Sequence, residues 1–139
     1  MNREALAIRL AVGFVGLVLV LGLWATGGPL QGRAERRDRQ RQQDLTEMAK
    51  WIDCLSILPA GLPETLTPTQ ACPFTGNLND PLTGQPYAYR KNTENAYLLC
   101  AQFETGRLLP EFPRTLQRRM TAAGFNRETG CLNLRPGQP

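Results

Sequence analysis

The residues of this chain that could do chemistry are its four cysteines and a few scattered acids. The chain contains no histidine, which removes the commonest general base and every nucleophile system that depends on one. Acids such as Asp80, Glu104 and Glu111 lie far apart in sequence and indicate no paired-carboxylate mechanism. No phosphate-binding glycine loop is present. We therefore expect no catalytic residues, no bound cofactor, no small-molecule substrate and no enzymatic activity.

The cysteines, Cys54, Cys72, Cys100 and Cys131, suit disulfides better than a metal or redox site. Structural zinc sites use closely spaced pairs, and a CxxC pair is absent, so we expect no metal ligands. An even number of cysteines in a small domain is typical of an oxidising compartment. Three connectivities are open to four cysteines. Among them we favour Cys54–Cys72 with Cys100–Cys131.

The stretch "DPLTGQPYAYR", Asp80 to Arg90, could be a binding loop or a turn that leads into a strand. Each of its special residues has a local backbone role. Asp80 can accept a hydrogen bond from a later amide, proline presets φ, and Gly84 can supply a positive φ. Tyr87 and Tyr89 alternate as in a strand with one buried face. We interpret the stretch as a turn and a strand entry.

These residues follow a segment that is long and apolar enough to cross a membrane. Positions 10–32 carry no charge, and a spanning helix needs about 20 mostly apolar residues. A cleaved signal peptide is the alternative, because arginines precede the segment and small residues follow it at 25–27. The run is longer than a signal core, so we favour an uncleaved anchor in contact with membrane lipid. Its expected anchoring side chains are Leu10, Phe14, Leu17, Leu21 and Trp24.

The sequence gives conflicting indications of orientation. Lysine and arginine near a span favour the cytoplasmic side. More of them follow the segment than precede it: Arg3 and Arg9 stand before it, and Arg33, Arg36, Arg37, Arg39 and Arg41 after it. The cysteines favour the opposite side. We expect a single-pass protein of the bacterial inner membrane with its C-terminal domain in the periplasm.

A second helix is predicted from Arg33 to about Leu58, after a kink at the glycines and proline of positions 27–29. Its first half is polar, and we expect a solvated stalk there. Contact with anionic lipid headgroups is an alternative, and nucleic acid is not expected as a partner. The second half carries an apolar stripe at three- and four-residue spacing, which predicts packing on a core. The stripe consists of Leu45, Met48, Trp51, Ile52 and Leu55.

The remaining chain predicts a small antiparallel sheet. Alternation before and after "KNTEN" indicates a β-hairpin that ends near Phe103. A short helix is expected after Pro113, ended by Gly124, and a third strand over 130–134. The fold class is α+β, tied by disulfides. The expected parts are an N-terminal flank (1–9), a transmembrane helix (10–30), a polar helical stalk (31–44) and a small extracytoplasmic domain (45–139).

This order of elements resembles type IV pilins and type II secretion pseudopilins. "DPLTGQPYAYR" is similar to the turn that leads into the first sheet strand of major pseudopilins, and the architecture is similar from about Leu10 to Phe103. The strand Tyr97 to Ala101 is also similar to that of small bacterial membrane-anchored domains. The resemblance implies a pilin-like domain. The chain departs from the pilin pattern because Gly13-Phe14 lies inside the apolar run, with no acid until Glu35.

These features predict a non-enzymatic accessory or structural subunit of a larger inner-membrane complex, of respiratory or photosynthetic type for example. Its partners would be other membrane protein subunits. A pilin-like component of a secretion or pilus system is the alternative, and a membrane-bound enzyme is the third hypothesis.

Overall fold

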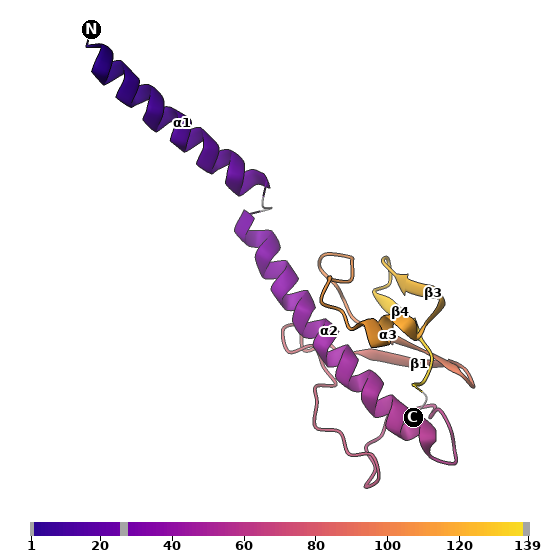
Figure 1. The fold of residues 1–139 in the computed structure, drawn as a ribbon. Coiled ribbons are helices and arrows are strands. Elements are labelled where there is room, and N and C mark those ends of the chain that lie inside the picture. The colour runs from indigo at the N-terminus through magenta and orange to yellow at the C-terminus, as the bar shows by residue number, and fades with distance from the viewer. Residues whose placement is uncertain (1, 26–27, 138–139) are drawn as a thin grey trace. The chain divides into compact units, whose positions relative to one another are not determined.

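The computed structural model describes residues 2–25 and 28–137, and they form an α+β protein (Figure 1). The chain divides into two compact units, Met1–Ala34 and Glu35–Pro139. The helices and strands in chain order are α1 (Arg3–Ala25), α2 (Gly28–Ile57), β1 (Ala88–Thr93), β2 (Ala96–Cys100), α3 (Arg114–Arg118), β3 (Met120–Asn126) and β4 (Cys131–Leu134).

Helix α1 is apolar along its whole length and buries none of its residues. It is the one helix in the described part of the chain that is long and apolar enough, by length and composition, to cross a membrane. The predicted anchoring residues all lie on this helix and are exposed: Leu10, Phe14, Leu17, Leu21 and Trp24. Gly27, where the predicted kink begins, lies outside the described residues.

Helix α2 begins at Gly28, five positions earlier than the predicted start at Arg33. Gly28 has a positive φ of 70° and marks the helix start. Pro29 follows in the first turn, where a missing backbone N–H costs nothing because that donor has no partner inside the helix. The helix ends at Ile57, just before the prolines and glycine of positions 59–63.

The expectation of a solvated first half holds for only one face of the part of α2 that belongs to the second unit, where Arg36, Arg39, Gln40 and Gln43 are exposed. Asp38, Arg41, Gln42 and Asp44 are all buried. Charged side chains are buried in this way only when they are paired and hydrogen-bonded, and these have partners from distant parts of the chain. The apolar stripe farther along is buried as well, with Leu45, Met48, Trp51, Ile52 and Leu55 at most 4% exposed.

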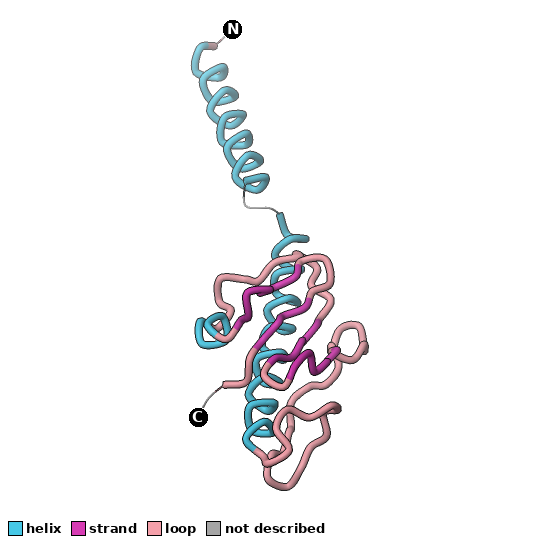
Figure 2. The backbone as a smooth tube through the Cα atoms, turned by 90° about the vertical axis from the view of Figure 1, so that its right-hand side faces the viewer, coloured by secondary structure: helices cyan, strands magenta, loops and turns pink. Residues whose placement is uncertain are grey.

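The strands form one antiparallel sheet in the order β1-β2-β4-β3, so the last strand in sequence occupies a central position. Figure 2 shows the strands side by side across α2. Alternate residues of the two central strands face the helix and are fully buried: Tyr97, Leu99, Leu132 and Leu134. They form one core with Leu45, Met48 and Ile52 of the α2 stripe and with Phe112 and Leu116 from the α3 region. Trp51 and Leu55 of the stripe pack in a second cluster with Cys72.

Strand β3 replaces the second part of the predicted helix. The helix after Pro113 is short, α3, and the chain turns into a strand at Met120. Gly124 does not end a helix but lies within β3 at a φ of +56°, in a stretch where the register with β4 shifts between Met120 and Phe125. Pairing with β4 therefore outweighs the local helix signal. The predicted hairpin is present, but its strands are shifted, because β1 extends to Thr93 and β2 ends at Cys100.

Two disulfides connect the cysteines, Cys54 with Cys72 and Cys100 with Cys131. The first ties the loop after α2 back to the helix. Trp51 lies beside it, donates from Nε1 to the Cys72 carbonyl at 3.0 Å and stacks on Phe74 with 4.4 Å between ring centroids. The second links β2 and β4 at directly opposed positions.

Candidate interaction surface on helix α2

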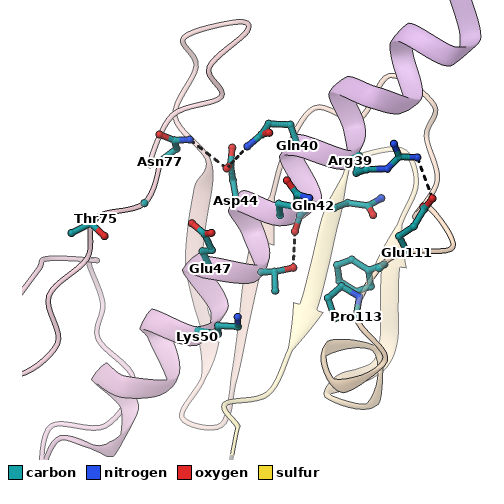
Figure 3. A pocket seen from close by; sticks show the side chains of 14 residues that line it. Arg39, Gln40, Gln42, Asp44, Glu47, Lys50, Thr75, Asn77, Glu111 and Pro113 are labelled. Carbon is teal, nitrogen blue, oxygen red and sulfur yellow. Dashed lines mark hydrogen bonds and ion pairs between the residues drawn. The ribbon is translucent and has the colours of Figure 1, made fainter.

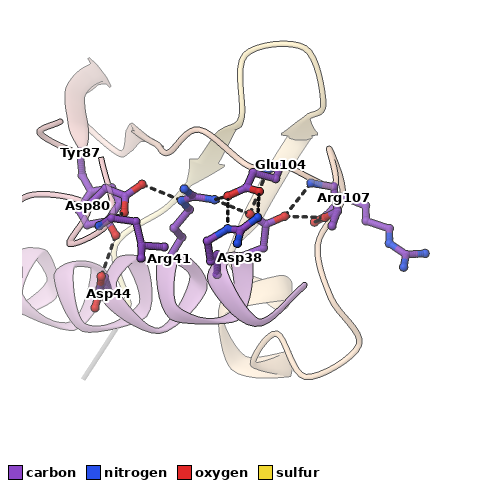
Figure 4. A network of polar contacts seen from close by, with 10 residues as sticks. Asp38, Arg41, Asp44, Asp80, Tyr87, Glu104 and Arg107 are labelled. Carbon is purple, nitrogen blue, oxygen red and sulfur yellow. Dashed lines mark hydrogen bonds and ion pairs between the residues drawn. The ribbon is translucent and has the colours of Figure 1, made fainter. Parts of the chain in front are cut away.

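The Arg41 guanidinium is 2% exposed and lies at the centre of a cluster of three acids. Its Nε donates to Asp80 at 2.7 Å, and its Nη1 donates to Asp38 at 2.8 Å and to Glu104 at 3.0 Å (Figure 4). The three acids come from α2 itself, from the turn before β1 and from the loop after β2. One side chain of α2 therefore holds two loops in place.

Asp38 also holds the loop after β2 in place, through hydrogen bonds to the backbone of that loop. Its carboxylate accepts hydrogen bonds from the amides of Glu104 and Thr105, at 2.9 and 2.8 Å, and from the Thr105 hydroxyl at 2.7 Å. Hydrogen bonds to an ionised acceptor are roughly twice as strong as neutral ones. The chain that leaves β2 is thus fixed to α2 through Asp38 as well as through Arg41.

The "DPLTG" turn is closed internally and then attached to α2 by Asp80. The Asp80 carboxylate accepts from the Leu82 amide at 2.9 Å, and the Gly84 amide donates to the Asp80 carbonyl at 2.8 Å. Burial by itself raises the pKa of the Asp80 carboxyl, but the Leu82 amide and the Arg41 guanidinium outweigh it, and the pKa lies below its usual value. Asp80 is therefore ionised and paired.

Glu104 lies at the edge of this cluster, where a second arginine reaches it. Arg37 donates from Nε to the Glu104 carboxylate at 2.7 Å. The hydrogen bond from Arg37 lowers the pKa of Glu104 to about 2, with Arg41 acting in the same direction against the effect of burial. The cluster of Arg37, Arg41, Asp38, Asp80 and Glu104 has a net charge of −1 (two cations, three anions), and each carboxylate in it has an arginine donor.

A second buried carboxylate of α2, Asp44, holds the start of the sheet. The Tyr87 hydroxyl donates to it at 2.7 Å, and Gln40 and Asn77 donate to its other oxygen at 3.0 and 3.4 Å. Burial first, and the hydrogen bond to Asp44 second, raise the pKa of Tyr87. The phenol is therefore neutral and acts as a donor, as a structural anchor requires.

Beside these contacts, α2 carries a surface recess of 770 Å³, which Gln40, Asp44 and Asn77 also line. Figure 3 shows the helix between Thr75 and Asn77 on one side and Glu111 and Pro113 on the other. Both charge signs line the recess, and Arg39 and Glu111 pair across it at 3.1 Å. Gln42 lines it too, is 4% exposed, and its Nε2 has no hydrogen-bond acceptor within the described chain. The recess therefore combines mixed charges with a buried donor that has no acceptor among the described residues.

Among the described residues, no group of three or more histidine, cysteine, aspartate or glutamate side chains is placed so that it could hold a metal ion. The four predicted cysteines are all joined in disulfides. The residues of the predicted core stripe are buried and do not line the recess.

The polar residues that organise this surface were missed in the sequence, although a signal was present. The apolar stripe has a spacing of three and four residues, and the same spacing continues toward the N-terminus through Arg41 and Asp38. Charged residues that continue a buried stripe in register indicate a paired, buried cluster. The interpretation of "DPLTGQPYAYR" as a turn agrees with the bonds of Asp80 and Gly84, but its link to α2 was not foreseen.

Comparison of the chain with protein-family models, with curated proteins and with solved structures finds no match.

Proposed function

We propose that this chain is a non-enzymatic, single-pass membrane protein that serves as an accessory or structural subunit of a larger complex of the bacterial inner membrane. The observation that carries the proposal is α1, a helix of 23 residues with none of them buried. An apolar helix of this length matches the hydrocarbon core of a bilayer. Lipid and neighbouring spans are the environments that would cover it.

The placement of the second unit in the periplasm is supported by its two disulfides. The arginines after the apolar segment favour a cytoplasmic second unit, and their ion pairs give another reason for their presence there. Arg37, Arg39 and Arg41 are each paired with an acid of the same unit. Their presence after the apolar segment therefore has a structural cause. After the apolar segment, Arg33 and Arg36 are exposed with no partner in the described chain. Before the segment there are also two arginines, Arg3 and Arg9, so the numbers of arginines on the two sides are then equal.

The hydrogen bonds of the buried carboxylates favour a structural role over catalysis. The buried carboxylates Asp38 and Asp80 accept hydrogen bonds from arginine and from backbone amides. Groups that are fully engaged in this way hold loops, and they are not free to exchange protons with a substrate. The recess on α2 is a surface that a neighbouring subunit would cover.

The decisive experiment is extraction of the protein from its native membrane in mild detergent, followed by identification of what co-purifies. Stoichiometric proteins from one complex are the expected result. A chain that runs alone at its monomer mass in several mild detergents would count against a subunit role. Arg41→Met should disrupt the ionic cluster and lose the partners through misfolding. Arg36→Met should leave the cluster folded, so a loss of partners in this variant would indicate a lost direct contact.

A pilin-like component of a secretion or pilus system is the second candidate. The feature that favours it is the order of elements in the second unit, a helix followed by a long loop and an antiparallel sheet. The two candidates separate by processing. N-terminal sequencing of the mature protein that begins at Phe14 would support the pilin-like component, and an N-terminus at Met1 would support the accessory subunit.

A further inference from the structure

The face of the sheet that points away from α2 contains a hollow of 610 Å³. The register places two rows of side chains on this face. Arg90, Leu98 and Asn133 form one row across β1, β2 and β4. Ala88, the Cys100–Cys131 disulfide and Asn126 form the other across the whole sheet. Short residues at both edges, Ala88 on β1 and Ala123 and Gly124 on β3, account for the hollow between them.

The hollow has a single charged lining residue, Arg90. Arg90 is exposed and makes no ion pair within the described chain, in contrast to the paired arginines of α2. An arginine guanidinium matches a carboxylate well because its donors form a planar fork. The hollow therefore has a free cation and no acid to neutralise it.

A second polar group without a partner in the described chain lies on β4, one strand beyond Leu98. The Oδ1 atom of Asn133 is buried and accepts no hydrogen bond from the described residues. A buried acceptor without a donor is destabilising, so a ligand that supplies an N–H gains from filling this position. Leu98 lies between Arg90 and Asn133, and the Cys100–Cys131 disulfide lies in the neighbouring row, so the floor of the hollow is apolar there.

We propose that this hollow binds an extended, acidic segment of a partner protein. Such a segment supplies a carboxylate for Arg90, a backbone N–H for Asn133 and an apolar side chain for Leu98. Arg90 and Asn133 lie two strands apart, roughly 10 Å at about 4.8 Å per strand. An extended peptide covers that distance in about three residues. The proposal rests on the proposed function, because it names the face by which a subunit holds its neighbour.

Other ligand classes fit less well. A nucleic acid or phosphate-rich ligand needs several cations, and the hollow provides Arg90 alone. A second copy of this chain would have to insert an acidic, extended segment. Strand β1, the exposed edge beside the hollow, carries Arg90 and Lys91 and no acid. Charge complementarity therefore favours a different protein.

The test uses the full chain in nanodiscs of phosphatidylcholine. The probe is a fluorescein-labelled eight-residue peptide in which leucine alternates with glutamate, and its partner probe has glutamine in place of each glutamate. Fluorescence anisotropy should show tighter binding of the glutamate peptide. Arg90→Glu should weaken that binding at least about tenfold, because an attraction becomes a repulsion. Asn133→Val should weaken it about fivefold through the lost acceptor and leave the fold intact.

The matched control is Arg127→Glu, which reverses an exposed arginine on the β3–β4 turn, outside the hollow. It should leave binding within about twofold, as expected of a charge beyond contact range. Equal binding of the two peptides, no binding of either, or an equal loss in Arg127→Glu and Arg90→Glu would overturn the proposal. A dimer of the chain in nanodiscs that Arg90→Glu dissociates would assign the face to a second copy and would also overturn it.

The outcomes separate this proposal from the proposed function. If native subunits co-purify equally with the wild type and with Arg90→Glu, the subunit role stands and the sheet-face assignment falls. If the wild type co-purifies with nothing but binds the glutamate peptide, the subunit role falls and the sheet-face assignment stands.

Discussion

Arg41 and Asp80 are joined by a hydrogen bond of 2.7 Å between Nε and Oδ2, although 39 positions separate them in sequence. Both side chains are almost inaccessible to solvent. The pair attaches the "DPLTG" turn to the helix and sets where β1 begins. A stretch that resembles an active loop in the sequence is therefore a fixed structural element, and its stability depends on a residue of α2.

Replacing Arg41 with methionine should strongly destabilise the second unit. The change leaves Asp38 and Asp80 buried without their cation, and breaking a buried pair in this way costs about 3–5 kcal/mol. Chemical denaturation of the full chain in detergent, followed by Trp51 fluorescence, measures the loss. The matched control Arg36→Met removes an exposed arginine with no partner in the described chain and should change the unfolding free energy by less than about 0.5 kcal/mol. Equal effects of the two variants would refute the role given to Arg41.

Stability should fall in acid, and Glu104 should contribute to the fall. Its folded pKa is about 2 and its ordinary value is 4.5, so the carboxylate stabilises the fold fully above about pH 4.5. As the pH decreases from 4.5 toward 2, the unfolded chain takes up the proton first and this stabilisation is lost. Asp80, whose pKa is also lowered, acts in the same direction.

The check is the melting temperature of the wild type and of Glu104→Gln as a function of pH. The variant should be less stable than the wild type at neutral pH, and the difference should shrink below pH 4.5. Glu128→Gln, an exposed acid without an ion pair in the described chain, should follow the wild type throughout. A constant difference between the wild type and Glu104→Gln from pH 7 to pH 2 would contradict the ion-pair explanation.

Tyr87→Phe should cost more than Tyr89→Phe. Both hydroxyls donate a hydrogen bond, at 2.7 Å to the Asp44 carboxylate and at 2.6 Å to the Pro63 carbonyl. A bond to a charged acceptor contributes about 1.5–3 kcal/mol and one to a neutral acceptor about 0.5–1.5 kcal/mol. Urea denaturation of the two variants compares them directly, and the reverse order would show that Asp44 is stabilised by its other donors.

Each disulfide should be formed in the native protein and should stabilise it. Alkylation without reduction should modify no cysteine, and alkylation after reduction should modify four. In the chain-entropy account, C54A/C72A, which opens a loop of 18 residues, should cost about 3 kcal/mol. C100A/C131A, with a separation of 31, should cost about 0.5 kcal/mol more. Free thiols in protein isolated from its native membrane would contradict a periplasmic location.

The parts of the fold that could be predicted are those in which one local pattern dominates. The stripe from Leu45 to Leu55 and the alternation around Tyr97 and Leu99 each indicate a single element and its buried face. Strand β3 could not be predicted in this way. Its residues follow a helix start at Pro113 and include Gly124, which is typical of a helix end, and only pairing with β4 determines its conformation.

The candidate surface was harder to predict because its groups act through partners far away in sequence. The composition of 33–44 suggests a solvated helix, and nothing local shows that Asp38 meets the amides of Glu104 and Thr105. The positions of Asp38 and Arg41 in register with the apolar stripe were the available evidence. The unmet acceptor of Asn133 and the unpaired Arg90 depend on the sheet register and leave no local pattern.

The central position of β4 determines when the second unit can fold during synthesis. Strand β2 has a neighbour on one side as soon as the hairpin is made, but its other side, and the whole of β3, must wait for residues 131–134. By then the apolar helix has long since left the ribosome. Under the proposed membrane topology, the apolar helix would reach the membrane while the second unit is still unfolded, which is the state that a protein-conducting channel requires of a segment it threads across.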